Sequence, residues 1–278
     1  MNGSASHRLL NAIALTALFG LTACASKSVM PGSKDIALNG VTYSIAQSGT
    51  GKPVVVFENG LASKKEVWNA VTTEIAKTNT VFTYDRTGQG GSSSSNEPRK
   101  GSRIVEELRS LLKAQGLQPP YVLVGHSLGG LYMQLYARKY PQEVSGLVLV
   151  DSTHPLHFAN EGAPENRSML SRAVVAVGMW GNTHEEYLNI AETGKEVLGL
   201  APLRAEMPAI ILIAPQTSPD SKDASLNRDN ELRWDFAKLY PQAQVREAHT
   251  GHNVHGENPQ LVVQTIQEVL GKIGKRAQ

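Results

Sequence analysis

The sequence lacks the residues and charges that mark several common protein classes. Its 278 residues include a single cysteine, Cys24, so no disulfide can form within the chain. Its formal net charge at pH 7 is +2, which gives no sign of a nucleic-acid partner or a strongly anionic one. Aromatic residues make up 6%, and no internal repeat is visible. The remaining composition, 41% hydrophobic and 19% charged, supports one α/β domain with a sizeable core.

The N-terminal segment has the pattern of an export signal. No acidic residue precedes Asp35, and an apolar run at residues 9–21 follows a histidine and an arginine. The run is too short to be a good membrane-spanning helix, so residues 1–23 are predicted to be a secretory signal peptide. It ends in Leu21-Thr22-Ala23-Cys24, which resembles the lipobox of bacterial lipoproteins. The alternative is ordinary cleavage after Ala23-Cys24-Ala25, which fits the small-x-small rule.

The lipobox resemblance implies that Cys24 is lipidated and becomes the new N-terminus. The protein would then be anchored to a membrane of the bacterial cell envelope, and Ala25 after the cysteine favours the outer membrane. Residues 24–34, rich in Ser, Gly, Lys and Pro, would form a flexible tether. Without lipidation, the expected location is the periplasm or the exterior.

Apolar stretches without alternation recur between amphipathic segments in the rest of the chain. Buried strands separated by helices predict a mostly parallel sheet covered on both faces. Asn39-Gly40 predicts an antiparallel hairpin at its edge. Beyond this hairpin, strands are predicted at 53–57, 80–84, 121–124, 146–150, 209–214 and 243–248, and helices at 64–77, 104–116, 131–139, 231–239 and after Asn258-Pro259.

One long stretch interrupts this rhythm. Residues 152–207 are too many for an ordinary loop and contain helix-like pieces at 169–177 and 185–191. We therefore predict one domain over residues 35–278, with residues 152–207 forming a helical cap over the site.

The hexapeptide Gly125-His126-Ser127-Leu128-Gly129-Gly130 carries the strongest functional signal. It lies between a predicted buried strand and a predicted helix, which is the layout of a nucleophile elbow. A serine at such a turn has a strained backbone, and side chains two positions away would collide with the crossing helix and strand. The pattern therefore predicts Ser127 as a nucleophile, which needs an adjacent base because a serine hydroxyl is weakly acidic.

The sequence resembles the α/β-hydrolase family from about Asp35 to Lys275, because it carries the family's characteristic pieces in the family's order. The matching pieces are Val54-Val55-Val56-Phe57-Glu58-Asn59-Gly60, Tyr84-Asp85-Arg86-Thr87-Gly88-Gln89-Gly90, the elbow hexapeptide, Gly146-Leu147-Val148-Leu149-Val150-Asp151, and Gly251-His252. The resemblance implies the α/β-hydrolase fold and implies no metal or organic cofactor. Serine as the nucleophile argues against haloalkane dehalogenases and epoxide hydrolases, which use aspartate there.

The resemblance places the general base at His252, after the last predicted strand. His249 and His255 are competing candidates, and all three could be a metal site because a spacing of three suits one helix face. Gly251 and Asn253 argue against a helix there, and no carboxylate or cysteine completes a ligand set.

The acid that orients His252 has two possible positions. The family usually takes it from the loop after the strand at 209–214, where Ser218 stands near the usual position and Asp220 or Asp223 would need a longer loop. The other position is the end of the strand before the cap, which is Asp151. We favour Asp151, although an aspartate at this position could instead have the purely structural role of capping the loop.

The resemblance also implies an oxyanion hole built from two backbone N–H groups. One would come from Leu128, after the nucleophile, and the other from Leu61. The family often has His-Gly before the second donor, whereas this chain has Asn59-Gly60. That difference changes the hydrogen bonding of the turn but not the backbone donor.

Five further residues have two interpretations each. Arg86 could clamp a substrate carboxylate, but an internal contact that fixes its loop is favoured. His154 and His157 lie at the entrance to the predicted cap and could touch substrate, although loop histidines with structural partners are commoner. Met179 and Trp180 are expected in the core or in the pocket wall.

Together these features predict an exported serine hydrolase that cleaves an ester or related acyl bond through an acyl-enzyme intermediate. The expected partners are a small-molecule acyl substrate and a membrane reached through the lipid anchor. Two alternatives stay open: a non-catalytic binding or sensing lipoprotein that keeps the fold, and a membrane-surface lipase. Low aromatic content and the lack of a long apolar run in the cap favour small soluble esters over lipids.

Overall fold

The computed structural model describes residues 30–159, 180–216 and 224–276. Several predicted features lie outside these residues: the signal peptide at 1–23, Cys24, most of the tether at 24–34, the helix-like piece at 169–177, Met179, Ser218, Asp220 and Asp223.

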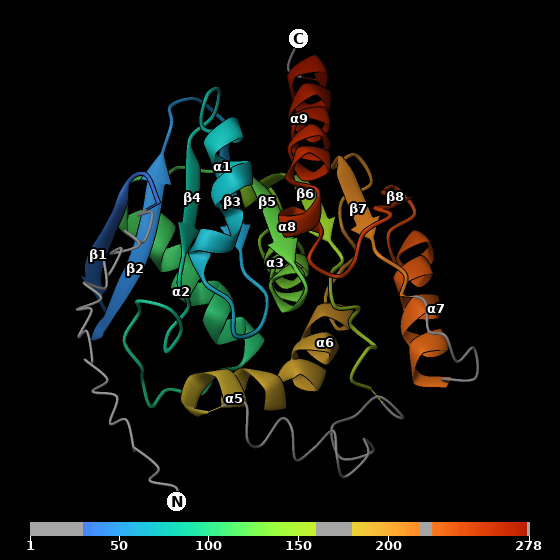
Figure 1. Ribbon diagram of the computed structural model, residues 1–278, viewed down its shortest axis with the longest axis horizontal. Coiled ribbons are helices and arrows are strands. Elements are labelled where there is room, and N and C mark those ends of the chain that lie inside the picture. The colour runs from blue at the N-terminus through green and yellow to red at the C-terminus, as the bar shows by residue number, and fades with distance from the viewer. Residues whose placement is uncertain (1–29, 160–179, 217–223, 277–278) are drawn as a thin grey trace, which may run out of the picture.

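The centre of the molecule is an eight-stranded sheet in the order β1-β2-β4-β3-β5-β6-β7-β8 (Figure 1). β1 pairs antiparallel with β2, and β2 with β4, while every other neighbouring pair is parallel. The predicted mostly parallel sheet with an antiparallel edge hairpin is therefore confirmed. The strands are β1 Ser33–Leu38, β2 Val41–Ser48, β3 Val54–Glu58, β4 Val81–Tyr84, β5 Tyr121–His126, β6 Val144–Val150, β7 Ala209–Ile213 and β8 Gln244–Glu247.

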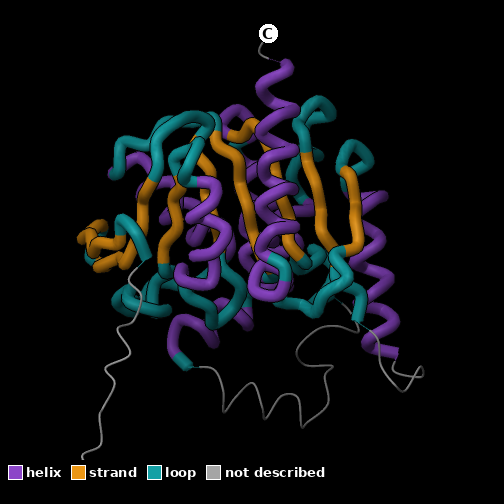
Figure 2. The backbone as a smooth tube through the Cα atoms, turned by 45° about the horizontal axis from the view of Figure 1, so that its top comes forward, coloured by secondary structure: helices purple, strands orange, loops and turns teal. Residues whose placement is uncertain are grey.

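Helices cover both faces of the sheet, as Figure 2 shows. The α-helices are α1 Asn69–Ile75, α2 Gly101–Ala114, α3 Leu128–Lys139, α5 Gly181–Leu188, α6 Ile190–Leu198, α7 Ala224–Leu239, α8 Val254–Glu257 and α9 Pro259–Arg276, and two 3-10 helices are η1 Lys65–Trp68 and η2 Pro141–Glu143.

Successive side chains of β5 enter two different cores. Tyr121 and Leu123 pack with residues of α2, α3 and α7, whereas Val122 and Val124 pack with residues of α1 and α9. Alternate side chains of a strand point to opposite faces of a sheet, and both faces are covered here. This explains why the central strands read as continuous apolar runs rather than alternating ones.

The predicted helical piece at 185–191 is the end of one helix and the start of another. α5 and α6 meet at Asn189, whose backbone (φ −94°, ψ 5°) departs from helical geometry and whose side chain donates to the Glu185 carbonyl at 2.8 Å. α6 packs against α3 on the side of the sheet where the carboxyl ends of the parallel strands lie (Figure 1). Trp180, expected in the core or pocket wall, is instead 77% exposed.

Within the described ranges, no helix combines the length and the apolar character needed to cross a membrane.

Candidate active site

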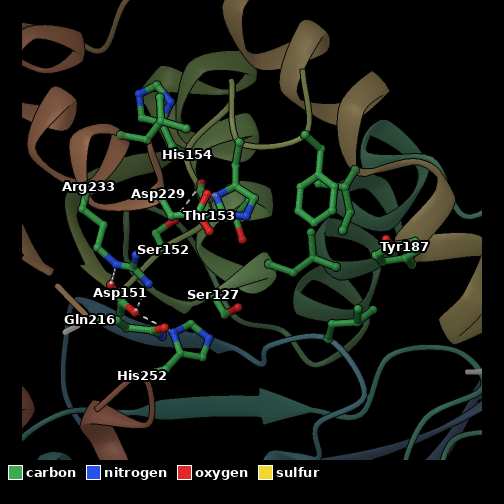
Figure 3. Close-up of a pocket in the computed structure, with 16 residues that line it drawn as sticks. Ser127, Asp151, Ser152, Thr153, His154, Tyr187, Gln216, Asp229, Arg233 and His252 are labelled. Atoms are coloured by element: carbon green, nitrogen blue, oxygen red, sulfur yellow. Dashed lines mark hydrogen bonds and ion pairs between the residues drawn. The ribbon is translucent and has the colours of Figure 1, made fainter. Parts of the chain in front are cut away.

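The carboxyl ends of the parallel strands bring the candidate site residues to one edge of the sheet. Leu61 follows β3, Ser127 follows β5, Asp151 follows β6 and His252 follows β8. All four line one cavity of about 260 Å³, together with Leu128 (Figure 3). Open α/β sheets place ligands at this edge, so the arrangement is that of a candidate active site.

Ser127 has the strained backbone expected of an elbow, with φ 52° and ψ −124°. A Cβ on Gly125 would lie 2.7 Å from the Gly129 carbonyl oxygen, and one on Gly129 would lie 2.4 Å from the Asn59 carbonyl oxygen. Real Cβ atoms do not approach backbone so closely. The first glycine therefore allows the strand to pass α3, and the second allows α3 to pass the end of β3, which is the steric role expected of both.

Asp151 and His252 are joined by a hydrogen bond of 2.5 Å between Oδ2 and Nδ1. The Asp151 side chain is fully buried, and its Oδ1 also accepts from the Ala214 N–H at 3.0 Å. Figure 3 shows Ser127 on the side of the His252 ring away from Asp151. This is the order nucleophile, base, acid that acyl transfer requires.

The Asp151 carboxyl is held in its charged form. Burial raises its pKa, but hydrogen bonds from His252 and Arg233 outweigh burial and lower the pKa to about 2. Arg233 is a site residue that the sequence analysis did not find. It lies on α7, and no local pattern marks it, because its partner Asp151 is 82 residues away in the chain.

His126 supports His252 from the strand that precedes the nucleophile. Its Nε2 lies 2.9 Å from the His252 carbonyl oxygen, and the two rings are 4.6 Å apart. Burial, helped by the neighbouring histidines, lowers the pKa of His126 to about 3. A neutral His126 with Nε2 protonated can therefore donate to the backbone that carries His252.

The Asn59-Gly60 turn before Leu61 is held from two sides. The Asn59 side chain donates to the Tyr84 carbonyl at 2.8 Å. Arg86 donates to the carbonyl oxygens of Asn59 at 2.6 Å and of Gly60 at 2.8 Å. The turn is thus fixed through its backbone, which positions the next residue, Leu61, at the cavity.

Arg86 itself is fully buried, so it makes an internal contact and is not a clamp for substrate. It forms ion pairs with Glu58 on β3 at 2.7 Å and with Glu186 on α5 at 2.9 Å. Asp85, the residue before Arg86, pairs with Lys65 at 3.2 Å. The loop is therefore fixed as predicted, but by carboxylates that are distant in sequence.

The two competing histidines have different surroundings in the structure. His249 is exposed and lies 3.2 Å from Glu247, whereas His255 is buried with its ring 4.5 Å from that of Trp68. Among the residues that the structure describes, no three histidine, cysteine or acidic side chains are grouped so as to hold a metal ion. His154 and His157 do line the candidate cavity.

Comparisons with known proteins agree with this architecture. Residues 53–173 match the family model described as alpha/beta hydrolase fold. The uncharacterized protein YqjL of Bacillus subtilis is 28% identical over 225 residues, covering 80% of this chain and 85% of that protein. The sn-1-specific diacylglycerol lipase ABHD11 of Mus musculus is 25% identical, covering 90% of this chain and 91% of that protein.

A solved thermophilic esterase from Thermogutta terrifontis superposes with a TM-score of 0.62 at 22% identity, covering 87% of this chain and 98% of that one. Together with the sheet order and the strained serine turn after β5, these matches show that the chain has the fold that defines the alpha/beta hydrolase superfamily.

Proposed function

We propose that the protein is a serine hydrolase that cleaves an ester or related acyl bond of a small substrate. The observation that carries the proposal is the hydrogen bond of 2.5 Å between the buried Asp151 carboxylate and His252 Nδ1, in a cavity that also contains the strained Ser127. This arrangement leaves His252 Nε2 to take the proton from Ser127.

In the proposed first step, the Ser127 oxygen attacks the acyl carbonyl carbon while His252 accepts the hydroxyl proton. The carbonyl oxygen becomes an oxyanion that accepts hydrogen bonds from the N–H groups of Leu61 and Leu128. The bond to the leaving group then breaks, and the leaving oxygen takes the proton from His252. Water repeats the sequence on the acyl enzyme, with His252 as base, and releases the acid and free Ser127.

The cavity favours a substrate with an apolar part. Its wall includes the side chains of Leu61, Phe158, Tyr187, Ile190 and Leu232. The described residues enclose about 260 Å³ there, and we propose a short acyl chain as the group that occupies this space. The relatives named lipase and esterase are consistent with ester hydrolysis.

Export and lipidation at Cys24 belong to the same proposal, because a lipid anchor would hold the enzyme at the cell envelope. Metabolic labelling with an alkyne fatty acid tests this point: label is expected on the parent and absent from Cys24→Ser.

The hydrolytic activity is tested with p-nitrophenyl butyrate and p-nitrophenyl palmitate. We expect the parent to prefer the short ester, and Ser127→Ala to lose about 10³-fold or more of kcat. Ser145→Ala is the matched control, because Ser145 lies at the opposite end of β6 from the cavity. Preference for the long ester would favour a membrane-surface lipase. A parent that hydrolyses neither ester faster than the uncatalysed background would favour a binding protein.

A further inference from the structure

From the described residues the Asp151 carboxylate accepts four hydrogen bonds, and two of them come from one side chain. His252 Nδ1 and the Ala214 N–H provide two. Arg233 provides the others, from Nε to Oδ1 at 2.8 Å and from Nη2 to Oδ2 at 3.1 Å (Figure 3). A guanidinium that binds both oxygens fixes the plane of a carboxylate as well as its charge.

Arg233 is itself held in place. Its side chain is 13% exposed, and its Nη1 lies 3.4 Å from the Asn230 side-chain oxygen on the preceding turn of α7. Asn230 also bridges to the segment after β7, where it accepts from the Gln216 N–H at 2.9 Å and donates to the Gln216 carbonyl at 2.7 Å. Arg233 therefore connects α7 and the segment after β7 to the buried acid at the end of β6.

Asp151 contacts the His252 ring directly at 2.5 Å, and Arg233 contacts Asp151. The other titratable side chains of the described residues near His252 are Asp229 on α7, which lines the same cavity, His126 on β5, and His255 and Glu257 on α8. Burial lowers the pKa of His126 to about 3 and that of His255 to about 4, so both are neutral at neutral pH. Asp229 faces His157 at 3.5 Å, and Glu257 accepts from the Gly251 N–H at 2.8 Å.

We propose that Arg233 is a positioning residue that turns the Asp151 carboxylate toward His252 and offsets part of its negative charge. The inference rests on the proposed function, in which His252 is the base. An unopposed buried carboxylate stabilises the protonated imidazole strongly, and a protonated imidazole accepts no proton from Ser127. By opposing that charge, Arg233 keeps His252 available as a base at lower pH, while the two hydrogen bonds keep the acid oriented.

The test compares Arg233→Met, which loses charge and geometry, with Arg233→Lys, which keeps the charge but not the bidentate contact. Lys238→Met is the matched control, because Lys238 is a cation on the same helix whose side chain is 85% exposed. One readout is the NMR titration midpoint of the His252 ring, assigned by its loss in His252→Asn. The other is the pH profile of kcat/KM for p-nitrophenyl butyrate.

In Arg233→Met we expect the acidic limb of the pH profile of kcat/KM, and the NMR midpoint with it, to move to higher pH than in the parent. The plateau of kcat/KM should fall by about tenfold, because the acid is less well oriented. In Arg233→Lys the pH profile should shift less, but the plateau value of kcat/KM should still fall clearly. Lys238→Met should match the parent in both readouts.

If folded Arg233→Met has the same NMR midpoint for His252 and the same plateau of kcat/KM as the parent, the inference is overturned, while the proposed function stands. A parent without esterase activity would contradict the proposed function, and the NMR midpoints would still report whether Arg233 acts on the pair. If Arg233→Met does not fold, Arg233→Lys decides, because a parental plateau in that variant contradicts the positioning role.

Discussion

Glu186 on α5 and Arg86 after β4 form an ion pair of 2.9 Å in which both side chains are fully buried. The same guanidinium binds the carbonyl oxygens of Asn59 and Gly60, directly before the proposed oxyanion donor Leu61. The residue after Glu186, Tyr187, lines the candidate cavity. α5 therefore contributes both to the wall of the cavity and to the support of the oxyanion turn.

Glu186→Gln is expected to affect both stability and catalysis. The variant removes one of the two carboxylates that pair with the buried Arg86 and leaves its guanidinium with Glu58 alone, so the free energy of unfolding should fall by about 2 kcal/mol. A displaced oxyanion turn should lower kcat more than it changes KM. Denaturant unfolding and steady-state kinetics measure both quantities, with the exposed neighbour variant Glu185→Gln as the control. Parental stability and kcat in Glu186→Gln would contradict this role.

Asp151→Asn tests which of the two candidate positions holds the acid. An asparagine leaves the size of the side chain nearly unchanged but cannot stabilise a protonated His252, and we expect kcat to fall by about 10³ to 10⁴-fold. Asp220→Asn and Asp223→Asn should keep activity close to that of the parent. The opposite ranking of the three variants in the same ester assay would move the acid to the segment after β7.

Two glycines on helices provide a test of the elbow geometry. Gly129→Ala places its Cβ 2.4 Å from a backbone oxygen of Asn59, whereas Gly271→Ala on α9 meets nothing within 4 Å. We expect Gly129→Ala to lower the free energy of unfolding by about 2 kcal/mol or more, and Gly271→Ala to raise it by about 0.5 to 1 kcal/mol. Equal effects in thermal unfolding would show that the close approach of α3 to β3 is not a constraint.

The Asp151 carboxyl should contribute to stability in a defined pH window. Its pKa is lowered to about 2 in the folded protein, so its contribution is present above the ordinary aspartate pKa and is lost as the pH falls toward 2. Over this window the parent should lose about 2 kcal/mol that Asp151→Asn does not lose. Denaturant unfolding of both proteins at pH 5, 4, 3 and 2 measures the difference. The same fall in the free energy of unfolding for the parent and Asp151→Asn would contradict it.

The parts of the site that the sequence predicted are those built from neighbouring residues. The tight turn at Ser127 requires small residues at neighbouring positions of the chain, so the glycines and the flanking strand and helix patterns predict it. The hairpin at Asn39-Gly40 and the apolar central strands are local in the same sense, and both were confirmed.

What the sequence left open depends on contacts across long separations. Asp151 meets His252 across 101 residues, and Arg86 meets Glu186 across 100, so no local pattern could select these partners. Arg233 was missed for the same reason. The prediction that Trp180 lies in the core or the pocket wall was wrong, because hydrophobicity alone does not say whether the residue directly before α5 is buried.

The central claim is that Ser127 is an activated nucleophile, and labelling with a fluorophosphonate probe tests it most directly. Intact-mass and peptide mass spectrometry should show one probe per chain, attached to the peptide that contains Ser127, and none on Ser127→Ala. The Asp151→Asn variant should be labelled far more slowly than the parent. A folded parent that stays unlabelled, or a label that persists in Ser127→Ala, would contradict the account.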